Sequence, residues 1–221
     1  MENKPAFEKA YRRANELLVS SKVIVDFPFA AKDLVKEVGH GTIVCRSFSK
    51  AEKYGVDITD FGSESAIIMK FHDKYIIFYD DTEPSYRIYF SIIHELGHYV
   101  LEHKLNLPKG SEYDRQEIEA NFFAAQTIMP EQIIRLFHKR GTSIDRSFIK
   151  NTFGTSDEAA QKRIDTLAKT SYEWRSRAEK EFDDVILYKF SAFIDRIRPV
   201  KNDYYDCDYE EEMQNKRNGW Y

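Results

Sequence analysis

The spacing of apolar residues changes along the chain, and its first part predicts two short helices. Apolar side chains recur at helical spacing between residues 6 and 19, which favours an amphipathic helix there. After the break at Phe27-Pro28, residues 29–38 are typical of a second short helix, and Gly39 is a suitable end for it.

Three segments rich in β-branched and aromatic residues then predict a small sheet. They are GTIVCRSF (41–48), SAIIMKF (65–71) and KYIIFYD (74–80). His72-Asp73 separates the last two as a tight turn, so these two strands should form a hairpin.

From Pro84 onward the apolar spacing becomes helical. Proline is tolerated in the first turn of a helix, because the N–H that it lacks would be unpaired there anyway. Apolar residues recur every four positions from Ile88 to Val100, so this helix should bury one face. A loop is expected at residues 104–112, followed by a helix over 113–129 that stops before Pro130.

The remainder predicts a helical C-terminal part. Residues 130–170 should hold two or three short helices, including SDEAAQKRIDTLAK (156–169). Residues 172–197 are expected to be helical too, although VILYKF within them is also compatible with a strand. The predicted fold class is α+β: mostly helical, with a small N-terminal sheet and a helical C-terminal part.

Composition narrows the class of protein. The apolar content of 42% can build a core, and 33 basic against 37 acidic residues give no polyanion-binding signature. We expect no direct binding to nucleic acid. The N-terminus has no signal-peptide pattern, no apolar run approaches a membrane span, and the two cysteines suit a reducing compartment. These features predict a cytoplasmic protein without a membrane segment.

The chain end differs in charge from the rest. Residues 203–212 carry six acids and no base, and removing them would change the formal net charge from −4 to +2. We therefore predict three parts: a main domain with a trailing helical subdomain at 1–168, a helical extension at 169–198, and a mobile acidic tail at 199–221.

One short motif carries chemistry: His94-Glu95-Leu96-Gly97-His98. On a helix, residues four apart share a face, so His94 and His98 can direct two imidazoles at one metal ion. Glu95 lies beside that ion, where it can deprotonate a water whose pKa zinc lowers to about 7. A chance occurrence in this chain has an expected count on the order of 0.01. The glycine costs about 1 kcal/mol in a helix interior, which suggests close packing at this turn.

The third ligand has several candidates. One zinc class uses a histidine six residues after the second, but Lys104 occupies that position. His103 comes five residues after His98, which on a continuing helix puts it on a different face, and it is expected to face elsewhere. The helix over 113–129 offers Glu117 and Glu119, which point to different sides.

A register rule chooses between the two glutamates. A glutamate ligand in zinc peptidases usually stands four residues before an Asp or Asn that supports a motif histidine. This favours Glu117 as the ligand with Asn121 behind it, and leaves Glu119 as a solvated or structural carboxylate. Glu119 stays open as the alternative ligand.

These segments resemble the ImmA/IrrE family of bacterial metallopeptidases, which has a zincin-like fold. The resemblance rests on Arg87, Tyr89-Phe90-Ser91, the motif at 94–98, the EIEANFFAAQTIMP segment (117–130) and FGTSDEAAQKRIDTL (153–167). It extends from about residue 5 to residue 168. Ile93 stands where the family usually has alanine, and the 125–130 segment is less leucine-rich than usual; neither position is a candidate ligand.

The resemblance implies a cytoplasmic zinc protease that cuts a helix-turn-helix transcriptional repressor or an antitoxin, in phage, mobile-element or stress control. The motif by itself indicates only a zinc hydrolase. Two other functions compete. A non-catalytic zinc-containing binding module would have no use for Glu95 as a base. A DNA-binding regulator is opposed by the charge balance, since acids offset the bases of residues 155–165.

Two features of substrate handling follow. An extended substrate can add to an exposed strand of the hairpin, either at residues 66–71 or at 75–80, unless both strands are fully paired. A further donor should stabilise the transition-state oxyanion, and Tyr99, Tyr113 and His138 are candidates among which the sequence does not choose.

Overall fold

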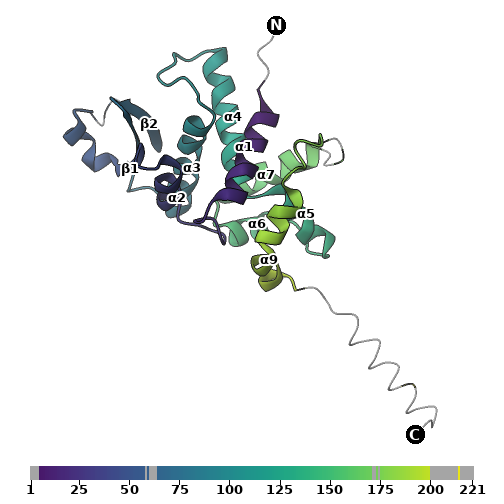
Figure 1. The fold of residues 1–221 in the computed structure, drawn as a ribbon. Coiled ribbons are helices and arrows are strands. Elements are labelled where there is room, and N and C mark those ends of the chain that lie inside the picture. Colours follow the sequence, from purple (N-terminus) through teal and green to yellow (C-terminus); the bar gives the residue numbers. More distant parts are fainter. Residues whose placement is uncertain are drawn as a thin grey trace.

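The computed structural model describes residues 5–57, 59, 64–170, 173, 175–199 and 214. Over these residues helices surround a core, with a small sheet at one side (Figure 1). This confirms the predicted α+β class, mostly helical with a small N-terminal sheet and a helical C-terminal part.

The two N-terminal helices form where the apolar spacing predicts them. Helix α1 (Phe7–Ser20) buries one face, and α2 (Ala31–Gly39) follows. The second helix begins two residues later than predicted, because the backbone of Ala30, the residue just before the helix, is extended. It ends as predicted at Gly39, after which His40 adopts a left-handed conformation with φ of 44°.

The three predicted strands form one sheet: β1 (Ile43–Ser47), β2 (Ala66–Phe71) and β3 (Lys74–Tyr79). The strand order is β1-β3-β2, with β1 parallel and β2 antiparallel to β3. The hairpin is therefore confirmed, and within the described residues β3 is paired on both sides while β2 is an edge strand. A 3₁₀ helix, η1 (Phe48–Tyr54), follows β1 and was not predicted.

Two long helices come next. Helix α3 (Ser85–Val100) begins directly after Pro84, and α4 (Ser111–Ile128) ends before Pro130, both as predicted. Helix α3 contacts β2 and β3 on one side and α4 on another (Figure 1). Helix α3 thus packs against both the sheet and α4.

Three short helices follow, at the upper limit of the prediction for residues 130–170. They are α5 (Glu131–Lys139), α6 (Arg146–Phe153) and α7 (Asp157–Lys169). Side-chain caps begin the last two, since Asp145 accepts from the Phe148 N–H and Ser156 accepts from the Ala159 N–H.

The prediction of helix throughout residues 172–197 is only partly correct. Helices α8 (Asp183–Lys189) and α9 (Ser191–Ile197) form, so VILYKF is helical rather than a strand. The described residues before α8 form turns instead, because Arg175 is held in a buried ion pair with Glu131 at 2.7 Å. Residues 171, 172 and 174 lie outside the described part.

One hydrophobic core joins residues from α1 through α9. Helices α8 and α9 contribute Ile186, Phe190, Phe193 and Ile194 to it. A smaller cluster covers the other face of the sheet and includes Phe48 and Phe78. The domain boundary at residue 168 stays a prediction, as does the mobile acidic tail, which lies outside the described residues except for positions 199 and 214.

Helices α3 and α4 approach each other closely at Gly97. A Cβ built there would lie 2.9 Å from Cδ1 of Phe123 and 3.4 Å from the Cα and carbonyl oxygen of Ala120. Glycine therefore lets α3 meet the backbone of α4, which confirms the close packing inferred from its cost in a helix.

We predict that Gly97→Ala destabilises the protein by up to about 2 kcal/mol. Overpacking typically costs about 1–3 kcal/mol, which outweighs the gain of about 1 kcal/mol in helix propensity. Gly110→Ala is the control, because its Cβ would meet nothing closer than 4.0 Å. Urea unfolding measures both variants. Equal stability of Gly97→Ala and wild type would show that α4 yields without cost.

Candidate metal centre

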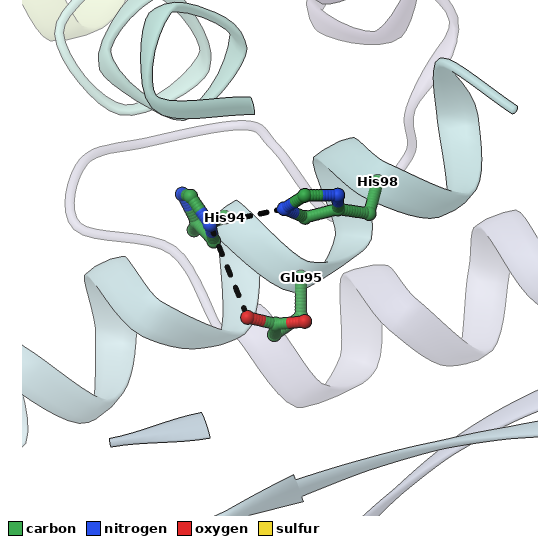
Figure 2. Close-up of side chains that lie close together, drawn as sticks. All are labelled: His94, Glu95 and His98. Atoms are coloured by element: carbon green, nitrogen blue, oxygen red, sulfur yellow. Dashed lines mark hydrogen bonds and ion pairs between the residues drawn. The ribbon is translucent and has the colours of Figure 1, made fainter. Parts of the chain in front are cut away.

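The three motif residues converge from one face of α3, as the helical spacing predicts. Nε2 of His94 lies 3.1 Å from Nε2 of His98 and 4.0 Å from Oε1 of Glu95 (Figure 2). One ligand atom from each of these residues lies within 4.8 Å of the other two. All three side chains are largely buried, so their polar atoms face one another rather than solvent.

Glu117 brings a carboxylate to the same place from α4. Its Oε2 lies 3.2 Å from Nε2 of His94, and its Oε1 lies 3.4 Å from Nε2 of His98. Metal–ligand distances of about 2.0–2.1 Å place tetrahedral zinc ligands about 3.3–3.4 Å apart. The three side chains therefore match the spacing of a tetrahedral zinc site.

Electrostatics also favour a cation at this point. Burial opposes charge on Glu117, but its contacts with His94 and His98 outweigh burial and lower the pKa of Glu117. Burial likewise opposes charge on His94, whereas its contact with Glu117 and the charge of Glu95 raise the pKa of His94. The carboxylates of Glu95 and Glu117 thus favour positive charge at the imidazoles. A divalent cation would supply that charge.

Asn121 supports the first histidine. Its Oδ1 lies 3.2 Å from Nδ1 of His94, one helical turn after Glu117 on α4. An acceptor at Nδ1 holds the proton there and leaves Nε2 with a lone pair for a metal. The structure thus places the predicted pair, Glu117 and Asn121, where the register rule puts them.

Glu95 is held by the sheet rather than by its own helix. Its Oε2 accepts a 2.8 Å hydrogen bond from the backbone N–H of Ile68 in β2, so the other oxygen is the one that faces His94. Burial raises the pKa of Glu95, while His94, His98 and this hydrogen bond oppose the rise. One oxygen is therefore fixed, and the other is directed at the candidate metal position.

The expectation that His103 points away from the metal position is confirmed, but not for the reason given. It assumed a continuing helix, but α3 ends at Val100, and Glu102 adopts φ of 60°. The chain turns back there, with the His103 N–H donating to the carbonyl of His98 at 3.0 Å. Nδ1 of His103 consequently lies 3.1 Å from Nδ1 of His98, behind the ring and away from the metal position.

Glu119 is a buried structural carboxylate and does not reach the three ligand atoms. Its Oε2 lies 3.1 Å from Nε2 of His103, and its Oε1 accepts a 2.8 Å hydrogen bond from the backbone N–H of Ala6. Burial and the neighbouring His98 lower the pKa of His103 to about 4, against the opposing effect of Glu119. Sequence reasoning missed this contact because it depends on where α3 stops.

The three candidate oxyanion donors have different surroundings. The hydroxyl of Tyr99 lies 3.0 Å from Oγ1 of Thr42, so it already has a partner. Tyr113 lies one helical turn before Glu117, and burial together with the charge of Glu117 raises its pKa. His138 lies in the last turn of α5, which is not among the elements that carry the motif or Glu117. Of the three, Tyr113 is electrostatically coupled to the ligand cluster.

Comparison with known protein families shows which family the chain belongs to. The model of the IrrE N-terminal-like domain, Peptidase_M78, matches residues 51–165, more than half of the chain. The chain belongs to the Peptidase_M78 family. The resemblance to ImmA/IrrE proteins is thereby confirmed, and the matched range includes β2, β3, α3 and α4 with the whole ligand cluster. A comparison with curated proteins gives no match.

The chain is therefore a member of a metallopeptidase family, with a candidate metal site formed by its His-Glu-x-x-His motif. In addition, none of the helices in the described residues combines the length and the apolar character that crossing a membrane requires.

We predict that Glu117, rather than Glu119, is the third ligand. Glu117→Ala should lose stoichiometric zinc, because two imidazoles alone bind zinc weakly. Glu119→Ala should keep one zinc per chain at saturating metal. Elemental analysis of the purified variants measures both. Normal zinc in Glu117→Ala together with loss in Glu119→Ala would transfer the role to Glu119.

Proposed function

We propose that this protein is a zinc-dependent endopeptidase of the cytoplasm that cleaves a regulatory protein, a helix-turn-helix repressor or an antitoxin. The observation that carries the peptidase proposal is the position of Glu95. It lies beside three side chains at tetrahedral zinc spacing, with one oxygen anchored and the other facing the site. The repressor or antitoxin substrate is what the resemblance to the ImmA/IrrE family implies.

Zinc, when bound, supplies a Lewis acid that polarises the scissile carbonyl and makes water acidic enough to attack at neutral pH. His94, His98 and Glu117 would hold it, and Asn121 keeps His94 in the tautomer that can bind. These four residues come from only two helices, whose separation is fixed at Gly97. The contact between these two helices therefore positions the candidate ligands.

Glu95 performs the proton transfers. Its Oε1 is free to orient the attacking water and to accept a proton from it, and it then delivers that proton to the leaving amine nitrogen. The raised pKa of Glu95 suits the first step, because a carboxylate that is more basic than usual is the better proton acceptor. The N–H of Ile68 prevents the carboxylate from rotating away.

The edge strand β2 supports a binding mode for an extended substrate. The N–H of Ile68 points away from β3, because it donates to Glu95. Outward groups alternate along an antiparallel strand, so the N–H groups of Ala66 and Lys70 point outward as well. Of the two strands considered from the sequence, β3 is paired on both sides, which leaves β2 as the strand that can accept a substrate.

A non-catalytic zinc-containing binding module is the alternative function. It would use the same ligands, His94, His98 and Glu117, to hold a fold together. The anchored Glu95 argues against it, because a structural site needs no general base beside the metal. If a neighbouring gene encodes a short helix-turn-helix protein, that protein is the substrate to test.

We predict that Glu95→Gln keeps fold and zinc but loses hydrolysis by about 10²–10⁴-fold. The amide can still accept from the N–H of Ile68, but it cannot take a proton from water. Cleavage of a fluorogenic peptide library and of the neighbouring gene's product, with zinc content in parallel, measures the effect. Unchanged turnover with full zinc would eliminate the peptidase mechanism, and zinc without hydrolysis in wild type would favour the binding module.

We further predict that Lys70→Pro raises KM for an extended substrate, because it removes an outward N–H while leaving the hydrogen bonds between β2 and β3. Lys70→Ala is the matched control, since it removes the exposed side chain but keeps the N–H. Steady-state kinetics separate KM from kcat. A normal KM in Lys70→Pro would mean that loops rather than β2 hold the substrate.

A further inference from the structure

A chain of three polar side chains extends from the candidate metal position into the protein. Nε2 of His98 faces Glu117, and its other ring nitrogen meets Nδ1 of His103 at 3.1 Å. Nε2 of His103 then meets Oε2 of Glu119 at 3.1 Å. The side chains of His103 and Glu119 are each only 5% exposed. The contacts thus form a continuous buried path, His98–His103–Glu119.

The direction of the hydrogen bonds along this path follows from its end. A carboxylate only accepts, so Nε2 of His103 donates to Glu119. A neutral His103 then has an acceptor at Nδ1, which accepts a hydrogen bond from the Nδ1–H of His98. This leaves Nε2 of His98 with a lone pair directed at His94 and Glu117. The reverse arrangement would put the proton of His98 on Nε2 and block metal binding.

The path is fixed at both ends by the backbone. The other oxygen of Glu119 accepts from the N–H of Ala6 at 2.8 Å, just before α1. At the near end, His103 is held by the hydrogen bond from its N–H to the carbonyl of His98. Lys9 also donates from Nζ to the carbonyl of Leu101 at 2.7 Å. The N-terminal segment and the turn after α3 therefore hold the two rings in contact.

We propose that His103 and Glu119 are positioning residues that fix the tautomer of His98, so that its Nε2 binds the metal. The inference rests on the proposed zinc site. It gives the two histidine ligands different supports: a neutral amide, Asn121, behind His94, and a carboxylate-backed imidazole behind His98. It also assigns a role to the second glutamate of the EIEAN segment.

The decisive variant is His103→Phe, which keeps a ring of similar size but removes both nitrogens. Loss of such a partner typically weakens metal binding by about 10–100-fold. We expect the zinc dissociation constant, measured by competition with a chelator, to rise by that factor. His103→Gln should recover most of the loss, because its amide oxygen and nitrogen can replace the ring acceptor and donor.

Ala6→Pro is the matched control for a purely structural role. It removes the N–H that Glu119 accepts at its other oxygen, but leaves the contacts between the three side chains in place. We expect this variant to lower the free energy of unfolding and to change the zinc dissociation constant less than His103→Phe does. A structural role for the path would instead weaken zinc binding equally in Ala6→Pro and His103→Phe.

Nitrogen-15 NMR of the metal-free protein gives an independent measurement. In wild type, His98 should be protonated on Nδ1, and in His103→Phe it should populate both tautomers. Equal zinc affinity in wild type and His103→Phe, or an unchanged tautomer, would overturn the proposal. If wild type binds no zinc, the proposed function fails, and the tautomer measurement then decides the positioning role alone.

Discussion

The close contact between α3 and α4 at Gly97 is the constraint on which the rest of the site depends. The motif histidines lie on α3, while Glu117, Glu119 and Asn121 lie on α4. Neither helix therefore carries the whole set of candidate ligands. The absence of a side chain at Gly97 lets the backbone of Ala120 approach to contact distance. Carboxylates are short, and they reach the imidazoles only because the two helices are this close.

A second constraint couples the sheet to the chemistry. The carboxylate of Glu95 belongs to α3, but its orientation is set by the N–H of Ile68 in β2. The same edge of β2 offers the outward groups at Ala66 and Lys70 that an extended substrate would need. Strand β2 would therefore position both Glu95 and a bound substrate, and a small shift of the hairpin would move both of them.

The C-terminal helices are part of the same packed body rather than an addition on its surface. Glu131 is fully buried yet ionic, with Arg135 at 2.6 Å and Arg175 at 2.7 Å. Arg175 also lies over the ring of Tyr11, 3.9 Å from its centroid, and Asp183 accepts from Gln132 at 2.8 Å. A buried charge without its partner is costly, so these contacts tie the segment before α8 to α1 and α5.

The sequence by itself determined the features that repeat with the period of one helix or one strand. Spacing four residues apart placed His94 with His98 and Glu117 with Asn121, because a helix fixes such neighbours locally. The β-branched segments and the His72-Asp73 turn located the hairpin at residues 65–80, and the register usual in zinc peptidases favoured Glu117 over Glu119.

Only the tertiary structure decided what depends on where an element stops or what lies beside it. His103 reaches His98 because α3 ends at Val100, and a helix end is set by contacts such as those of Lys9 and Glu119 that come from distant residues. Residues 175–182 form turns because a buried ion pair to Glu131 outweighs their helical pattern. The edge position of β2 likewise follows from β1 pairing with β3, a choice between strands that no local periodicity contains.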